Sequence, residues 1–156
     1  MAWLTMALAV GATALDGILA GASLDQSIKQ LPARHRMGVV AFSAYSRAAD
    51  LGNGIFWYAL LGVGAAVITI AAAVAALVSG SLPGQTLPLV IAAILSVLHS
   101  LATSQAAPTN FSQRKVQNDE VALALVFDRF ARWQTLRALL QALTFAAMLW
   151  ALAAPR

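Results

Sequence analysis

The sequence predicts an all-α integral membrane protein, a four-helix bundle formed as a single domain over residues 1–156. Three observations predict this fold. The chain has four long apolar stretches, its basic residues gather in two of the three connections, and the stretches with their connections use nearly all of the chain. About 20 helical residues cross a bilayer core roughly 30 Å thick. The apolar stretches lie at about 2–24, 54–78, 87–106 and 136–154.

The first apolar stretch, 2–24, is interpreted as a membrane helix rather than a cleaved signal peptide. It lacks a basic amino-terminal region and carries Asp16 inside its apolar run. Its Gly17-x-x-x-Gly21 spacing indicates close helix packing, because small residues let two helices approach each other.

The connection to the second stretch is expected to be largely helical. Ser23 to Gln26 has the spacing of a capping box, and Pro32 can end one short helix and begin the next. Residues 37–51 have an amphipathic helical pattern. The run 52–54, Gly-Asn-Gly, predicts a bend at the membrane boundary, because glycine is costly within a helix.

The remaining connections differ in composition. Residues 79–86 carry no charge, and Pro108-Thr-Asn110 indicates a turn after the third stretch. Residues 115–133 combine helical periodicity with mixed charges. We therefore expect the second and fourth helices to extend past the membrane on the cytoplasmic side.

The charges predict the orientation of the bundle. In an up-down-up-down arrangement the first and third connections share one side, and 79–86 shares the other side with both termini. Because basic segments stay in the cytoplasm, both termini are expected to be extracytoplasmic, in a bacterial inner membrane. The basic residues are Lys29, Arg34, Arg36, Arg47, Arg114, Lys115, Arg129, Arg132, Arg137 and Arg156.

Composition excludes several classes of function. The isoelectric point is near 10.4, but the basic residues lie close to membrane boundaries, so lipid rather than nucleic acid is the expected partner. The absence of cysteine excludes disulfides, thiolate metal sites and a cysteine nucleophile. One intramembrane histidine with one or two acids is a poor ligand set, so neither metal nor cofactor is expected.

Polar residues form a stripe on each helix, in the half nearest the basic connections. An unpaired charge in hydrocarbon costs at least about 2.5–3.5 kcal/mol, so these side chains are expected to face inward and meet. The resulting hypothesis is one polar cluster that opens toward the cytoplasm. Its expected members include Asp16, Arg47, Asp50, Asn53, Trp57, His99, Trp133, Arg137 and Gln141.

Most of these residues also have an ordinary structural interpretation. Arg47 and Asp50, three residues apart, could form a structural ion pair. Arg137 could extend to lipid headgroups. Trp57 and Trp133 could belong to an interfacial aromatic belt.

Asp16 and His99 are the leading candidates for chemistry. Asp16 is an acid well within an apolar run, which indicates a functional or ion-pairing role. His99 is the only intramembrane histidine, and its alternative is a hydrogen-bonded core residue. His35, in the basic connection, is expected at the surface.

Short motifs are spread over both halves of the chain. They are Gly21-Ala-Ser-Leu, Leu31-Pro-Ala, Gly38, Tyr45-x-x-Ala48, Pro108-Thr-Asn110 and Trp133-x-x-x-Arg137. Together they resemble a family of small four-helix membrane proteins, mostly of unknown function, that includes the fungal anthrone oxygenases. That family often has a histidine just before the arginine, where this chain has Leu136.

The resemblance implies a cofactor-independent oxygenase that acts on a small aromatic substrate. In such enzymes a base removes an acidic C–H proton, and cationic or hydrogen-bonding groups stabilise the enolate. It implies His99 or Asp16 as the catalytic base. The substrate-binding residues that it implies are Arg137, Asn110, Gln141, Trp57 and Trp133, with Asn53 beside them.

Different classes of function stay open. One is a membrane enzyme or binding protein for a small hydrophobic molecule. Another is a non-catalytic subunit packed in a homo-oligomer or a larger membrane complex. A transporter is disfavoured because one four-helix unit contains no inverted repeat. A cavity lined by Asp16, His99 and Arg137 would favour the first, whereas outward-facing polar stripes would favour the second.

Overall fold

The computed structural model describes residues 2–155, and Met1 and Arg156 lie outside the described residues. Over that range the regular structure is entirely helical, with four helical stretches long and apolar enough to cross a membrane. These stretches are Trp3–Met37, Val39–Val78, Pro83–Val116 and Glu120–Ala153. The predicted all-α fold with four membrane-length helices is confirmed.

The stretches divide into α-helices and two short π-helical segments. In chain order these are α1 (Ala2–Asp25), η1 (Gln26–Gln30), α2 (Leu31–Met37), α3 (Val39–Ala48), η2 (Ala49–Asn53), α4 (Gly54–Val78), α5 (Pro83–Phe111), α6 (Gln113–Val116) and α7 (Glu120–Ala153). The π-helical segments, η1 and η2, both lie in the basic half of the chain.

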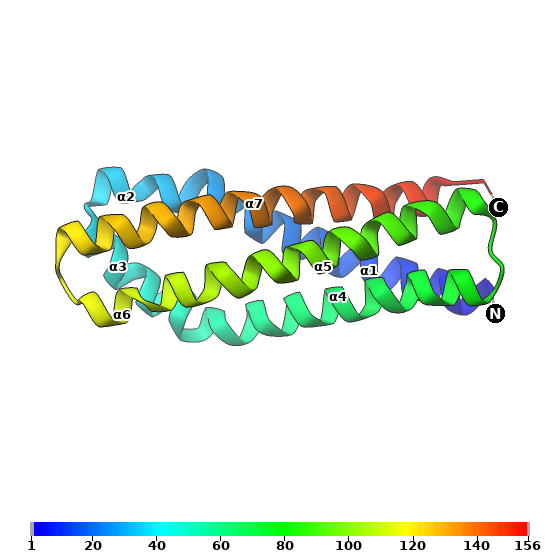
Figure 1. Ribbon diagram of the computed structural model, residues 1–156, viewed down its shortest axis with the longest axis horizontal. Coiled ribbons are helices and arrows are strands. Elements are labelled where there is room, and N and C mark those ends of the chain that lie inside the picture. The colour runs from blue at the N-terminus through cyan, green and yellow to red at the C-terminus, as the bar shows by residue number, and fades with distance from the viewer. Residues whose placement is uncertain (1, 156) are drawn as a thin grey trace.

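The long helices lie side by side in an elongated bundle (Figure 1). Helix α1 packs against α4 and α7, and α5 packs against the same two helices. The connection from α4 to α5 lies at the same end as the two chain termini (Figure 1). Helices α2, α3 and α6 gather at the opposite end, called the basic end below.

The helix ends follow from local chemistry. Gly80, between α4 and α5, has φ +64°, a conformation that glycine adopts without strain. Asp119 caps α7, since its Oδ1 accepts a hydrogen bond of 3.0 Å from the backbone N–H of Ala122. Such a cap contributes about 1 kcal/mol to helix stability.

Two buried clusters form the core. The cluster nearer the termini is rich in alanine, with Ala12, Ala72 and Ala92 fully buried, and small side chains allow helices to approach closely. The cluster at the basic end is aromatic, and the rings of Phe42 and Phe127 meet edge to face at 4.9 Å.

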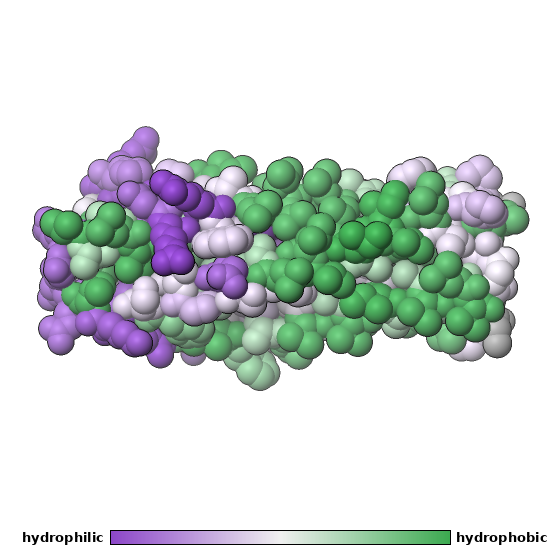
Figure 2. Space-filling view, viewed as in Figure 1, coloured by the Kyte–Doolittle hydropathy of each residue, from purple (hydrophilic) through white to green (hydrophobic). Residues whose placement is uncertain are grey.

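The surface divides into an apolar body and a polar end. Apolar residues cover most of the length of the bundle, and hydrophilic residues gather over α2, α3 and α6 (Figure 2). Large hydrophobic side chains such as Val63, Leu101 and Leu139 are exposed on the apolar body. Such a surface suits lipid contact, because lipid tails are themselves apolar.

Glycine and proline residues affect the helices at three places where the sequence predicts a bend, a turn or a helix boundary. The bend predicted at 52–54 is confirmed, since Gly52 has non-helical angles of φ −95° and ψ −116°. The turn predicted at Pro108-Thr-Asn110 is wrong, because α5 continues through Pro108 to Phe111. At Pro32 one segment ends and the next begins as expected, since η1 ends at Gln30 and α2 begins at Leu31, but no break separates them. Neighbouring helices and local π or 3₁₀ geometry allow proline to be accommodated in such helices.

Candidate functional site

The η2 segment sets the rotation of α4. Gly52 inside it has non-helical angles, so the chain kinks there and the side chains of α4 do not continue the faces of α3. Arg114 Nη2 donates a 2.7 Å hydrogen bond to the carbonyl oxygen of Leu51 and holds the bend from the neighbouring α5–α6 region. Gly54 is required there, because an added Cβ would lie 2.7 Å from the carbonyl oxygen of Ala49.

This rotation brings Tyr58, and not Trp57, to the interior. Trp57 is 59% exposed and packs edge to face on Phe56, and Asn53 is also exposed. The structure therefore does not bring Asn53 or Trp57 to the cavities described next. The expected spacing of three or four residues assumed a regular α-helix across 49–53, which η2 interrupts.

Two adjoining cavities lie between α4, α5 and α7. The basic-end cavity, of about 270 Å³, is lined by residues that include Ser23, Gln26, Asp50 and Asn110. The seam cavity, of about 480 Å³, lies along α4 and α5 and includes His99. Five residues line both cavities: Tyr58, Ala59, Thr103, Ala107 and Arg137. The two cavities thus meet at Arg137.

Arg137, on α7, is held in place from one side only. Its Nη1 donates a 2.7 Å hydrogen bond to Gln134 Oε1, and Gln134 Nε2 donates to the backbone oxygen of Ser23 on α1. Its buried Nε has no hydrogen-bond partner. The ion pairs within residues 2–155 join Asp25 to Lys29 and Arg34 to Asp128, so Arg137 has no carboxylate within ion-pair distance.

His99, on α5, is 4% exposed, and its Nε2 has no hydrogen-bond partner. The alternative of a core histidine with both ring nitrogens hydrogen-bonded therefore does not describe this residue. A buried polar group without a partner costs about 1–3 kcal/mol. A ligand or an ordered water that binds this nitrogen would remove the cost.

Asp16 is not in this site. It is fully buried, its Oδ2 accepts a 2.9 Å hydrogen bond from Thr69 Oγ1, and its Oδ1 accepts one of 2.9 Å from Gln141 Nε2. These bonds tie α1, α4 and α7 together, and neither cavity is lined by Asp16 or Gln141. The residues expected to form a single cluster therefore fall into two groups. One group lines the cavities, and the other is the buried hydrogen-bonded group of Asp16, Thr69 and Gln141.

Asp50 belongs to a separate hydrogen-bond chain at the basic end. Its Oδ2 accepts a 2.9 Å bond from Ser46 Oγ, which in turn accepts one from Gln113 Nε2. The same Nε2 donates to Asn110 Oδ1 at 2.7 Å, and Gln113 Oε1 accepts from Ser43 Oγ. Gln113 was not among the expected site residues, because a glutamine in a polar connection gives no sign that it is buried.

The expected ion pair between Arg47 and Asp50 is not among the ion pairs of the described chain. The Ser46 hydroxyl lies against the Asp50 carboxylate instead. Trp133 packs against the aromatic cluster of the basic end, so the structure places it in the core rather than in a cavity wall.

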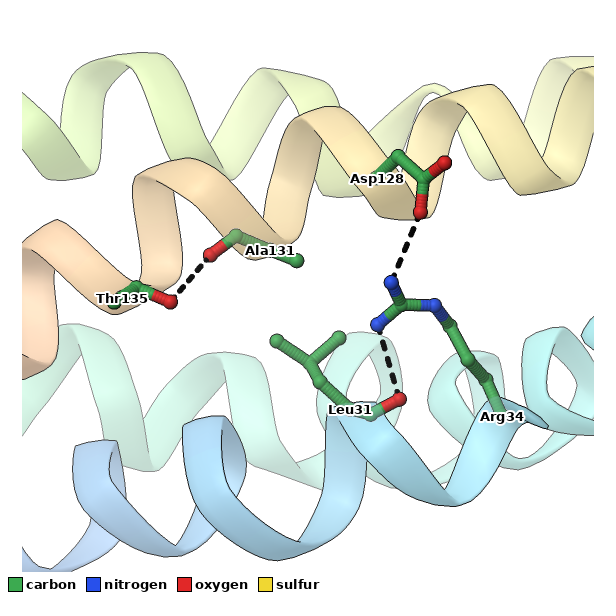
Figure 3. A network of polar contacts seen from close by, with 5 residues as sticks. All are labelled: Leu31, Arg34, Asp128, Ala131 and Thr135. Atoms are coloured by element: carbon green, nitrogen blue, oxygen red, sulfur yellow. Dashed lines mark hydrogen bonds and ion pairs between the residues drawn. The ribbon is translucent and has the colours of Figure 1, made fainter. Parts of the chain in front are cut away.

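An ion pair joins α2 to α7 at the basic end (Figure 3). Arg34 Nη2 lies 2.9 Å from Asp128 Oδ1, and its Nη1 donates a 3.0 Å bond to the carbonyl oxygen of Leu31. The Arg34 side chain is 10% exposed but that of Asp128 is 60% exposed, so water screens this pair as it does other surface pairs. On the same face of α7, Thr135 Oγ1 donates to the carbonyl oxygen of Ala131 (Figure 3).

No cluster of three or more histidine, cysteine, aspartate or glutamate side chains suited to a metal ion occurs in the described part of the chain. Comparison of the chain with family models, curated proteins and solved structures gave no match. The cavities and their polar groups are therefore the features of this chain that bear on its function.

Proposed function

We propose that this protein binds a small hydrophobic molecule in the seam cavity. One observation carries the proposal: two buried nitrogens without partners, His99 Nε2 and Arg137 Nε, belong to residues that line the same cavity. The rest of its wall is largely apolar and includes Val63, Ala66 and Val67. Apolar walls with a few convergent polar groups are typical of small-molecule sites.

The proposed setting is an up-down-up-down bundle in a bacterial inner membrane. The concentration of hydrophilic residues over α2, α3 and α6 supports a cytoplasmic position for the basic end (Figure 2). In this orientation α7 and the α3 region extend into the cytoplasm, both termini lie outside, and the ligand site lies in the cytoplasmic half.

The proposed chemistry is that of a cofactor-independent oxygenase of the anthrone-oxygenase type. The relation to that family rests on the motifs of the sequence, with Leu136 at the place of its histidine. His99 is the better candidate base, because Asp16 lines neither cavity. Arg137 can stabilise the oxyanion of the resulting enolate. Dioxygen is the oxidant: a CH₂ group and O₂ give a carbonyl group and water.

Two variants test this function. His99→Ala and Arg137→Gln are each expected to lower oxygen uptake with an anthrone-like substrate by roughly a hundredfold, a usual loss for a base or an oxyanion donor. His35→Ala is the matched control, because His35 is exposed on α2. Turnover that is unchanged in both site variants would remove the catalytic role.

A binding measurement separates the enzyme from the non-catalytic subunit. Small molecules that copurify with the detergent-solubilised protein are expected in the unmodified chain and reduced in both site variants. A preparation that instead contains a stoichiometric partner protein and no small molecule would favour the subunit.

A further inference from the structure

The seam between α4 and α5 stays hollow beyond the seam cavity. A third groove of about 370 Å³ lies between the same two helices, nearer the termini, and all of its lining residues are apolar. It is lined on α4 by Ala73, Val74 and Leu77, and it shares Ile70 with the seam cavity. Together they form one track, here called the α4–α5 track.

The track is polar at one end and apolar along the rest. Counted along α4 from Tyr58 to Leu77, it is roughly 28 Å long at about 1.5 Å per residue. Arg137 lies at its polar end, where the seam cavity meets the basic-end cavity. His99 lies further along, next to Val97 and Leu98 of the apolar groove, which continues toward the termini. A ligand that fills it needs a compact polar head and one long apolar chain.

The charge of Arg137 selects the head. Its Nη1 donates to Gln134 and its buried Nε has no hydrogen-bond partner, so no carboxylate in the seam cavity neutralises the guanidinium. A guanidinium binds a carboxylate through charge-assisted hydrogen bonds.

The carboxylate of Asp50 decides on which side of Arg137 the head lies. Asp50 lines the basic-end cavity but not the seam cavity. An anionic head in the basic-end cavity would face a second carboxylate, and like charges repel. In the seam cavity the head meets Arg137 without a facing carboxylate.

We propose that the α4–α5 track binds a single-chain amphiphile with a carboxylate head, which enters sideways from the bilayer. This inference rests on the proposed binding function and names its ligand class. The amphiphile would compete with an anthrone-like substrate for the seam cavity and Arg137. Entry from the side follows from exposure, since Val63, Val67 and Val74 of α4 and Val97 and Leu101 of α5 face outward beside the track.

The head is expected to provide most of the binding free energy, and the apolar track is expected to select ligands by the shape of their chain. A chain already dissolved in lipid gains little hydrophobic free energy by moving into an apolar groove, because lipid tails are as apolar as the groove. The charge-assisted bonds of Arg137 are therefore expected to dominate the binding.

Gly62 offers a way to block the track without disturbing the bundle. It lines the seam cavity, and a Cβ added there would meet nothing within 4 Å. Gly11 on α1 has equally open space, but it lines none of these hollows. Gly62→Leu and Gly11→Leu are thus a matched pair, in which only the first fills the track.

The experiment measures saturable binding of radiolabelled hexadecanoate to the full-length protein in nanodiscs. Hexadecanol, with the same chain and a neutral head, and anthrone are the competitors. We expect hexadecanoate to bind at least roughly tenfold more tightly than hexadecanol, and Arg137→Gln to remove that difference. Gly62→Leu should abolish binding, and Gly11→Leu should leave it unchanged.

The outcomes separate the two proposals. If hexadecanol or anthrone binds as tightly as hexadecanoate, and Gly62→Leu still blocks binding, the carboxylate-headed ligand is wrong and the cavity function stands. Equal binding by Gly62→Leu and the unmodified chain would show that the ligand does not occupy the α4–α5 track. If none of the probes binds saturably, both the ligand class and the proposed binding function fail. Gly62→Leu keeps the test decisive if Arg137→Gln does not fold.

Discussion

Asp16 and His99 show how similar expectations for two residues can lead to different roles. Both are ionisable side chains in apolar helices, and both are buried. Asp16 is satisfied by Thr69 and Gln141, whereas His99 Nε2 has no partner and His99 lines a cavity. The sequence located both residues but could not separate them, because hydrogen-bond partners on other helices are set by tertiary packing.

The first prediction separates a structural from a functional role. Asp16→Ala removes two interhelical hydrogen bonds and should destabilise the bundle by about 1–2 kcal/mol, on the scale of such bonds in membranes. Thermal unfolding in detergent measures this loss, and ligand affinity of the folded fraction should be unchanged. His99→Ala should lower the ligand affinity and leave the stability of the bundle unchanged. A loss of affinity without a loss of stability in Asp16→Ala would return Asp16 to the site.

At the scale of elements, η2 is the feature that most altered the expected site. The glycines at 52 and 54 predicted a bend, and the structure has one, but the rotation of α4 depends on the non-helical backbone angles that Gly52 adopts. A regular helix would have carried the polar stripe to Trp57, and η2 carries it to Tyr58. Glycine spacing alone does not specify this register.

The second prediction tests that segment. Gly54→Ala places a Cβ 2.7 Å from the carbonyl oxygen of Ala49, and because that atom is backbone, the bend must shift. We expect a destabilisation of about 1–3 kcal/mol and weaker ligand binding, since Tyr58 follows four residues later. Thermal unfolding and binding measure the two effects.

Gly64→Ala is the control for this change. Its Cβ would meet only Leu15 Cδ1 at 4.0 Å, an ordinary contact, in the same helix. It should be neutral or stabilise α4 by up to about 1 kcal/mol, because alanine is the better helix former. Equal stability of the Gly54 and Gly64 variants would contradict the role of η2.

At the scale of the whole molecule, hydropathy and charge were sufficient to predict the helical fold. Apolar length determines where a chain can cross a bilayer, so the four membrane-length helices followed directly from the sequence. The cavities did not follow, because their shape depends on helix rotation and on small residues such as Ala59 and Gly62. The same limit explains why Gln113 and Tyr58 were not expected.

The third prediction concerns orientation. The chain contains no cysteine, so a single introduced cysteine reports its own position. In intact cells a membrane-impermeant maleimide should label Gly84→Cys, at the end of the bundle that holds the termini. Asn118→Cys, at the basic end, should be labelled only after the membrane is opened. The opposite pattern would reverse the orientation and place the site in the outer half.

The central claim is that the hollow beside His99 and Arg137 holds a hydrophobic molecule. Native mass spectrometry of the protein released from detergent tests it most directly, with Gly62→Leu and Gly11→Leu measured in parallel. The account predicts a bound small molecule on the unmodified chain and on Gly11→Leu, and none on Gly62→Leu. A bound mass that persists in Gly62→Leu, or that is absent from all three proteins, would contradict it.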